Sequence, residues 1–226
     1  MYIFVIISFL ISFAAQIHVQ TTFKKYSKVR NERGMTGAEA ARQLLLEHGI
    51  ANVPIEHVSG SLTDYYDPVS NVIRLSDDVY SSDSVAAVGV AMHEAGHAVQ
   101  YAQNYAPVRL RNAIVKSTNI SSTVSYILIL VGFLLGGGSG RVGYGLITLG
   151  ILFFCAVIFF QVVTLPVEFN ASGRALRALQ DSMIMSSEEQ KCVRKVLSAA
   201  AMTYVAAVAV SLLQLLRLLA IRGRRR

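Results

Sequence analysis

The sequence predicts an α-rich integral membrane protein, with about four transmembrane helices and a small α+β domain that carries a helix with the pattern H-E-x-x-H. Hydrophobic residues make up 53% of the 226 residues, and charged residues make up only 15%. An ordinary soluble domain has about 25% charged residues. The apolar residues gather in long blocks, and the H-E-x-x-H pattern lies between the first two of them.

The distribution of charge favours a lipid surface as partner. The net charge is +7, and the arginines cluster at the ends of the apolar blocks. Positive charge in those places sets membrane topology and meets anionic headgroups. No basic stripe interleaved with aromatic residues is present, so nucleic acid is not an expected partner. Cys155 and Cys192 lie in no C-x-x-C pair, which argues against a disulfide or a thiolate metal site.

The sequence divides into five segments. The first apolar run precedes a basic stretch, which is the reverse of a cleaved signal peptide and indicates a membrane anchor. A glycine-rich turn at Gly136–Arg141 separates two further apolar runs, as in a helical hairpin. The expected segments are an N-terminal transmembrane anchor (1–20), a cytoplasmic domain (21–118), a transmembrane hairpin (119–165), a polar helix (166–198), and a transmembrane or interfacial helix with a basic tail (199–226).

Local signals place several elements inside the domain of residues 21–118. Thr36 and Glu39 form a capping box at the start of a helix, and Gly49 ends that helix. Two short strands are expected at Ile50–Val58 and Asn71–Leu75, with the residues between them forming a turn. The second strand is also a candidate edge strand that could hold an extended peptide.

A further helix of this domain carries His93-Glu94-Ala-Gly-His97. Histidines four residues apart lie on one face of a helix and can bind the same zinc ion. Glu94 can then accept a proton from a water that the zinc activates, as a general base in hydrolysis. The flanking residues are apolar, and polar side chains on a buried helix need partners. The pattern therefore indicates a catalytic zinc site rather than two surface histidines.

A catalytic zinc ion needs a third protein ligand. No histidine follows His97, and no Asp or Glu lies between Glu94 and Glu168. A hairpin of two spans returns the chain to the membrane face that it left, which is the face of the histidines. Pro166 is expected to begin a new helix with Glu168 in its first turn. Glu168 is therefore the predicted third ligand.

Other side chains are candidates for supporting roles. Asn170 and Ser172 could orient a ligand by hydrogen bonds. The alternatives to Glu168 as third ligand are His18, His48 and His57. An oxyanion could be stabilised by His57, Tyr65, Tyr66 or Arg174, and the sequence does not select among these four.

Five stretches carry a resemblance to a known family: Met35-Thr-Gly-Ala-Glu, Gly60-Ser-Leu-Thr-Asp-Tyr-Tyr-Asp-Pro, Ser84-Val-Ala-Ala, His93-Glu-Ala-Gly-His-Ala-Val-Gln and Leu165-Pro-Val-Glu-Phe-Asn-Ala-Ser. Over nearly its whole length the chain resembles the bacterial YugP-type family of neutral zinc metallopeptidases of the membrane. Its layout is also similar to HtpX and CAAX-type membrane proteases, in which the equivalent glutamate binds zinc. An Asp usually follows that glutamate four residues later, where this chain has Ser172. The resemblance implies a zincin-like domain, one Zn²⁺ ion and peptidase activity.

The sequence therefore predicts a zinc-dependent endopeptidase in the cell membrane that cleaves peptide or membrane-protein substrates at the cytoplasmic face. One alternative is a site-2-type intramembrane metalloprotease, whose active helix also often reads H-E-x-G-H, although no Asp-Gly pair follows in a later span. The other is a catalytically silent zinc-binding scaffold, which would not need Glu94.

The C-terminal basic tail bears on the topology. Four transmembrane spans would leave Arg222–Arg226 outside the cell, which opposes the positive-inside rule, unless the last apolar block lies along the membrane interface. The substrate and any oligomer stay open.

Overall fold

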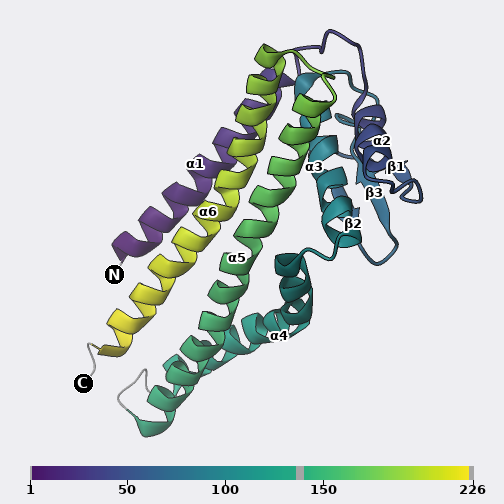
Figure 1. The fold of residues 1–226 in the computed structure, drawn as a ribbon. Coiled ribbons are helices and arrows are strands. Elements are labelled where there is room, and N and C mark those ends of the chain that lie inside the picture. Colours follow the sequence, from purple (N-terminus) through teal and green to yellow (C-terminus); the bar gives the residue numbers. More distant parts are fainter. Residues whose placement is uncertain (1, 136–139, 224–226) are drawn as a thin grey trace. The chain divides into compact units, whose positions relative to one another are not determined.

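In the computed structural model, the described residues are 2–135 and 140–223, and they form helices and one small sheet (Figure 1). This confirms the predicted α-rich class with a small α+β part. The helices are α1 (Tyr2–Tyr26), α2 (Gly37–Glu47), α3 (Val85–Ala102), α4 (Ala106–Leu134), α5 (Arg141–Asp181) and α6 (Ser187–Gly223). The strands are β1 (Ile55–His57), β2 (Tyr65–Asp67) and β3 (Val72–Leu75).

Four of the described helices, α1, α4, α5 and α6, are long and apolar enough to cross a membrane. Their number agrees with the prediction of about four transmembrane helices. The predicted turn at Gly136–Arg141 falls mainly on residues 136–139, which lie outside the described residues, as do residues 224–226 of the basic tail.

The chain forms two compact units, which are described separately. The first, called the span unit below, comprises residues 1–15, 109–165 and 203–226. The second, called the site unit, comprises residues 16–108 and 166–202, and it contains the H-E-x-x-H helix α3.

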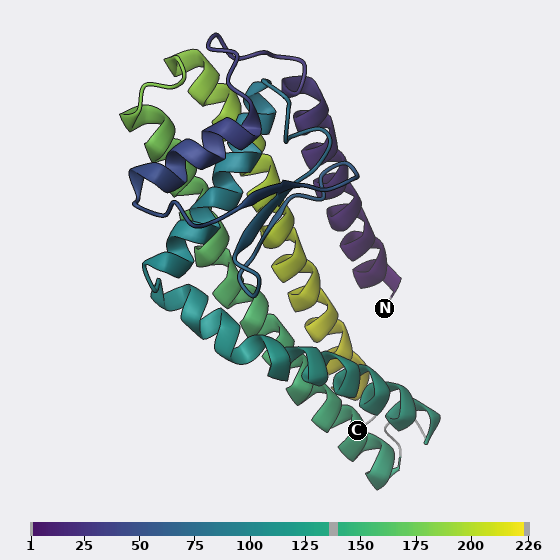
Figure 2. The same cartoon turned by 90° about the vertical axis from the view of Figure 1, so that its right-hand side faces the viewer.

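The sheet of the site unit has the strand order β1-β3-β2 (Figure 2). Strand β3 pairs in parallel with β1 and antiparallel with β2. Two expectations are therefore wrong: residues 65–67 form a strand instead of a turn, and the candidate edge strand at Asn71–Leu75 is the central strand. Three residues are too few to show the alternation that identifies a strand. The edge that borders α3 belongs to β2.

Helix α2 begins as the sequence predicts. The hydroxyl of Thr36 accepts a hydrogen bond from the backbone N–H of Glu39, and the Glu39 carboxylate accepts one from the N–H of Thr36. Gly49 follows the helix with a φ of +70°, a conformation that favours glycine. The predicted capping box and helix end are confirmed.

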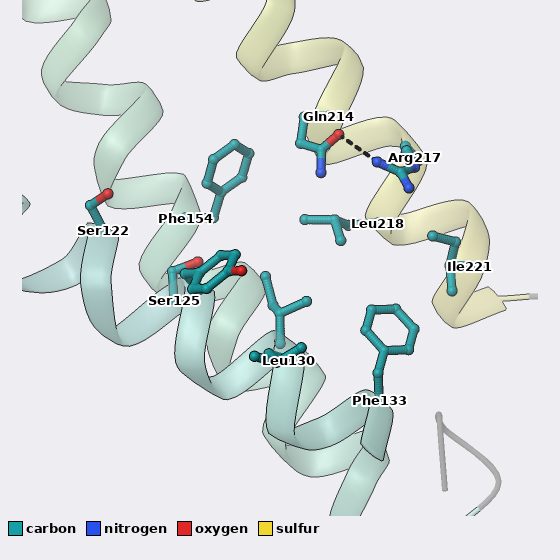
Figure 3. Close-up of a pocket in the computed structure, with 11 residues that line it drawn as sticks. Ser122, Ser125, Leu130, Phe133, Phe154, Gln214, Arg217, Leu218 and Ile221 are labelled. Carbon is teal, nitrogen blue, oxygen red and sulfur yellow. Dashed lines mark hydrogen bonds between the residues drawn. The ribbon is translucent and has the colours of Figure 1, made fainter. Parts of the chain in front are cut away.

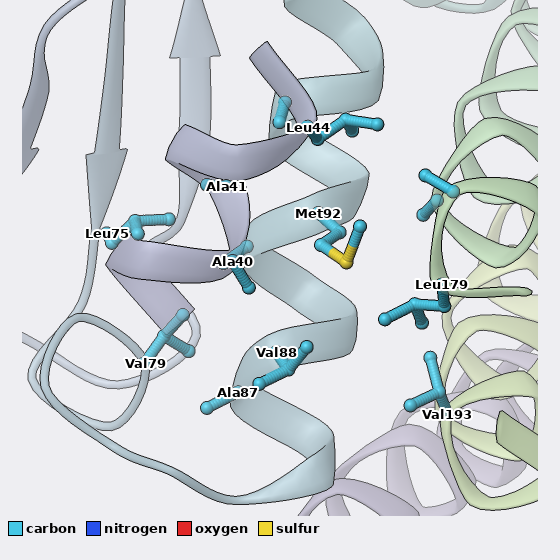
Figure 4. Packing of buried hydrophobic residues seen from close by; sticks show 14 of the residues in the cluster. Ala40, Ala41, Leu44, Leu75, Val79, Ala87, Val88, Met92, Leu179 and Val193 are labelled. Carbon is cyan, nitrogen blue, oxygen red and sulfur yellow. The ribbon is translucent and has the colours of Figure 1, made fainter. Parts of the chain in front are cut away.

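Helix α3 is the core of the site unit. Ser84 caps it by accepting a hydrogen bond from the N–H of Ala87. Fourteen of its residues are buried, because α2 and the sheet cover one side and the start of α6 and the end of α5 cover the other. Figure 4 shows Val88 and Met92 between Ala40 of α2 and the side chains of Leu179 and Val193. A helix that is apolar on most sides belongs in a core, and this burial fixes the positions of its few polar side chains.

Helix α5 runs without interruption through Pro166. The prediction that Pro166 begins a new helix is wrong. A proline inside a helix removes the hydrogen bond that its missing N–H would make, and apolar membrane helices tolerate this loss. The helical path breaks instead after Asp181, with Met183 at a φ of +50°. The single helix expected at 166–198 is therefore the end of α5 and the start of α6, where Ser186 and Glu189 exchange capping hydrogen bonds.

Candidate metal centre

The site unit brings His93, His97 and Glu168 together from α3 and α5. The Nε2 atoms of the two histidines lie 3.2 Å apart. The Oε2 atom of Glu168 lies 3.4 Å from Nε2 of His93 and 3.5 Å from Nε2 of His97. His97 and Glu168 are buried, and His93 is partly buried. Residues far apart in the sequence thus form one compact triangle of nitrogen and oxygen atoms.

The size of this triangle fits a zinc ion. Tetrahedral zinc has bonds of about 2.0–2.2 Å to nitrogen and oxygen, which places neighbouring ligand atoms about 3.3–3.6 Å apart. The three observed separations of 3.2, 3.4 and 3.5 Å agree closely with that range. Two histidines and a glutamate are also a ligand set found in catalytic zinc sites, which keep a fourth position open.

The hydrogen bonds of the histidines direct their electron pairs toward the centre of the triangle. Nδ1 of His97 lies 3.0 Å from the side-chain oxygen of Gln100. An amide oxygen can only accept, so Nδ1 carries the proton and Nε2 of the neutral ring presents a lone pair. The Oε2 atom of Glu168 is buried and has no hydrogen-bond partner among the described residues. A cation at the centre of the triangle would stabilise these electron-pair donors, the two Nε2 atoms and the Glu168 oxygen.

Gln100 links His97 to helix α5. Its amide nitrogen donates to the carbonyl oxygen of Val167 at 2.8 Å and to the side-chain oxygen of Asn170 at 2.9 Å. Asn170 in turn accepts a hydrogen bond from Nε of Arg174 at 2.8 Å. Asn170 therefore acts on His97 through its hydrogen bond with Gln100. Because Gln100 is fully buried, this chain of hydrogen bonds holds the His97 ring in one orientation.

The other histidine is held from α5 directly. Nδ1 of His93 lies 3.0 Å from the hydroxyl oxygen of Ser172. The hydroxyl of Ser172 can accept a hydrogen bond from Nδ1–H of His93, as the amide oxygen of Gln100 does from Nδ1–H of His97. Nε2 of His93 is then left facing the triangle. Both residues proposed from the sequence for orienting the ligands, Asn170 and Ser172, thus lie in the hydrogen-bond network around the histidines.

Glu94 lies beside the triangle and is held by the sheet. Its Oε2 atom accepts a hydrogen bond of 2.9 Å from the backbone N–H of Tyr66 on β2. The side chain is buried, and this burial raises the pKa of Glu94, whereas a positive charge on a protonated His93 or His97 would oppose the rise. A carboxylate whose pKa is raised toward neutrality is suited to accept a proton.

The remaining sequence candidates have other partners. His57 pairs with Asp77 at 2.6 Å, and Nδ1 of His48 lies 3.0 Å from the carbonyl oxygen of Leu44. His18 is exposed on α1. Nη1 of Arg174 donates to Gln103, and the hydroxyl of Tyr66 donates to Asn71. None of the three histidines belongs to the triangle that the described residues form.

Sequence reasoning missed two contributors, Gln100 and the backbone N–H of Tyr66. Gln100 had a detectable signal, because it is a polar residue three positions after His97 on an otherwise apolar helix and lies on the same face. The role of Tyr66 depends on strand β2, where the sequence predicts a turn. The contact is made by the backbone N–H, so the residue type at this position does not reveal it.

Comparison with known proteins identifies the family of the chain. A family model described as "Putative neutral zinc metallopeptidase" matches residues 1–223. The chain is 48% identical over 218 residues to a Bacillus subtilis (strain 168) protein named "Putative membrane protease YugP", which covers 96% of this chain and 94% of the relative. No solved structure matches. The resemblance found in the sequence is thereby confirmed.

Proposed function

The chain belongs to the family described as "Putative neutral zinc metallopeptidase". We propose that it is a membrane-bound, zinc-dependent endopeptidase. The observation that carries the proposal is the triangle of His93, His97 and Glu168 with Glu94 beside it. Such a set of residues serves the hydrolysis of peptide bonds, and a zinc site with a purely structural role needs no neighbouring base.

In this proposal His93, His97 and Glu168 hold one Zn²⁺ ion. When bound, the ion supplies Lewis acidity, which polarises the scissile carbonyl and acidifies water. Ser172 and Gln100 keep the two imidazole rings aimed at the same point. Glu168 is buried, and in such a low-dielectric setting its carboxylate attracts a dication more strongly than it would in water.

Glu94 acts as general base and then as general acid. Its carboxylate takes a proton from the attacking water and later delivers that proton to the leaving amine. The hydrogen bond from the N–H of Tyr66 holds one carboxylate oxygen of Glu94. The other oxygen is then the one that exchanges the proton.

An extended peptide is the substrate form that this arrangement suits. Strand β2 is the outer strand of the sheet and provides the N–H that holds Glu94. A peptide added along that edge would lie next to the base, with main-chain hydrogen bonds to groups other than the Tyr66 N–H giving affinity. Strand β2 is thus the proposed peptide-binding edge, in place of the strand expected at Asn71–Leu75, which is central in the sheet.

We place the site at the cytoplasmic face of the cell membrane. The support is the location of the basic segments 24–33, 109–116 and 174–195, which flank the apolar runs and favour the cytoplasmic side. The segment division 1–20, 21–118, 119–165, 166–198 and 199–226 is retained as a proposal for what lies in and beside the bilayer.

The test uses the purified full-length chain in detergent. Zinc content is measured by mass spectrometry, and cleavage of unfolded casein is followed with and without a chelator, with Glu94→Gln as control. We expect about one zinc per chain and cleavage that the chelator and the substitution abolish. Full zinc occupancy with no cleavage of casein or of membrane-protein fragments would favour the silent scaffold instead. Cleavage restricted to bonds inside transmembrane segments would favour a site-2-type protease.

A further inference from the structure

The span unit contains a cavity of about 740 Å³ between α4, α5 and α6 (Figure 3). Its wall is largely apolar and includes Phe133 of α4, Phe154 of α5, and Leu218 and Ile221 of α6. Small-molecule sites in proteins typically have volumes of about 300–1,000 Å³. The cavity is therefore large enough for a ligand of substantial size.

One charged side chain, Arg217, lies on the cavity wall. Its Nη1 atom donates to the side-chain oxygen of Gln214 at 3.2 Å. Its Nε atom is buried and makes no hydrogen bond with any described residue. Figure 3 shows Arg217 and Gln214 together on α6, on the side of that helix that also carries Leu218. A buried guanidinium N–H without a partner is costly, which points to an acceptor that the described residues do not supply.

The sequence of the span unit contains no side-chain carboxylate. Residues 1–15, 109–165 and 203–226 contain no Asp and no Glu. Positive charge is instead plentiful, since Arg141 and Arg222 also belong to this unit, and Arg222 lies over the ring of Tyr144 at 4.8 Å. An external anion would therefore stabilise a cation that lies in this apolar helix bundle.

We propose that this cavity binds one anionic phospholipid, with the phosphate on Arg217 and an acyl chain along Phe133, Phe154 and Leu218. The planar guanidinium matches phosphate oxygens geometrically, and its free Nε–H supplies a donor. The apolar wall matches an acyl chain, and all three helices are apolar enough to lie in a bilayer. Tyr126 and Leu130 line the cavity and are 70% and 46% exposed, so the site is accessible from the surrounding lipid.

The first experiment measures lipid retention by the full-length protein in detergent. Native mass spectrometry counts phosphatidylglycerol and phosphatidylcholine retained at equal added concentrations. We expect about tenfold preference for phosphatidylglycerol, and we expect Arg217→Gln to reduce it to less than twofold. Arg222→Gln is the matched control, because Nε of Arg222 is likewise buried without a hydrogen-bond partner among the described residues, but its side chain does not line the cavity. Equal loss of preference in both variants would show that net charge alone attracts the lipid and would overturn the proposal.

A second pair of variants tests the acyl-chain part without changing any charge. Leu130→Trp fills part of the cavity, whereas Leu149→Trp alters a side chain of nearly equal exposure, 45%, that does not line it. We expect at least fivefold lower retention of phosphatidylglycerol for the first variant and no change for the second. Unchanged retention in both would overturn the proposal. So would displacement of the lipid by an apolar peptide with a free C-terminal carboxylate at tenfold lower concentration, which would assign the cavity to a peptide.

Discussion

Gly96 of α3 lies directly against the backbone of Ala171 in α5: a Cβ atom at Gly96 would come within 2.8 Å of the Ala171 carbonyl oxygen. Gly96 stands immediately before His97, and Ala171 stands immediately before Ser172. The absence of a side chain at Gly96 therefore lets the two helices approach at the point where the histidines meet Glu168. The close approach of α3 and α5 is a condition for the candidate metal centre.

Gly96→Ala should destabilise the site unit and weaken zinc binding together. The added methyl meets backbone atoms, which cannot rotate away, and overpacking of this kind costs about 1–3 kcal/mol. Thermal unfolding and zinc titration measure the two effects. Gly173→Ala is the control, because a Cβ at Gly173 meets nothing within 4 Å, and alanine in a helix is favoured by about 0.5–1 kcal/mol. Normal zinc affinity in Gly96→Ala would show that the contact does not set the ligand geometry.

Glu94→Gln should retain zinc and lose catalysis. Glutamine keeps the shape of the side chain and can still accept the hydrogen bond from the N–H of Tyr66 through its amide oxygen. It cannot accept the proton of the attacking water. Loss of a general base typically costs about 10²–10⁴-fold in rate. Turnover numbers are to be compared at equal zinc occupancy, and near-normal turnover there would exclude Glu94 as the base.

The sequence revealed those parts of the site that depend on local spacing. His93 and His97 face one point because they are four residues apart on a helix, and the capping box at Thr36 is a short-range pattern. The packing of α3 against α5 depends on Gly96, which the sequence pattern alone does not distinguish from any other helical glycine. Strand β2 is three residues long and is stabilised by pairing with β3. Its sequence is too short to show the alternation of apolar and polar residues that would predict a strand.

The prediction of Glu168 at the site relied on the order of apolar runs and on elimination, and the structure does place its carboxylate beside the two histidines. The expectation that Pro166 begins a new helix is nevertheless wrong, because α5 continues through Pro166. Membrane helices keep their remaining hydrogen bonds around a proline, so a rule for helix starts in soluble proteins misplaced this boundary.

The part of the chain between β2 and β3 allows a direct test of membrane topology. Val69 is 95% exposed in that turn. A Val69→Cys variant in which Cys155 and Cys192 are replaced by alanine should be labelled by a membrane-impermeant maleimide only after the cells are opened. The cysteine-free parent is the control. Labelling of intact cells would place the site unit outside and contradict the cytoplasmic assignment.

Gln100→Ala should weaken zinc binding although Gln100 is expected to bind no metal. Removing the amide leaves Nδ1 of His97 and the Asn170 side chain without their shared partner. Loss of a group that orients a ligand typically costs about 10–100-fold in metal affinity. Competition with a chromogenic zinc chelator measures the change. Gln103→Ala is a suitable control, because Gln103 contacts Arg174 and not a histidine, and equal affinity losses in both variants would count against a specific role for Gln100.

Glu168→Gln should abolish tight zinc binding. The amide oxygen carries no charge, so one of three ligands loses most of its attraction for a dication, and the two histidines alone are a weak site. Glu188→Gln is the matched control, since Glu188 is exposed and forms an ion pair with Lys191 far from the histidines in sequence. We also expect the Glu189→Gln variant to keep zinc. Because Glu189 caps α6 and accepts a hydrogen bond from the N–H of Glu32, the thermal stability of this variant is measured separately. Zinc content after dialysis distinguishes the variants. If Glu168→Gln retains one zinc per chain at wild-type affinity, another residue must supply the third ligand.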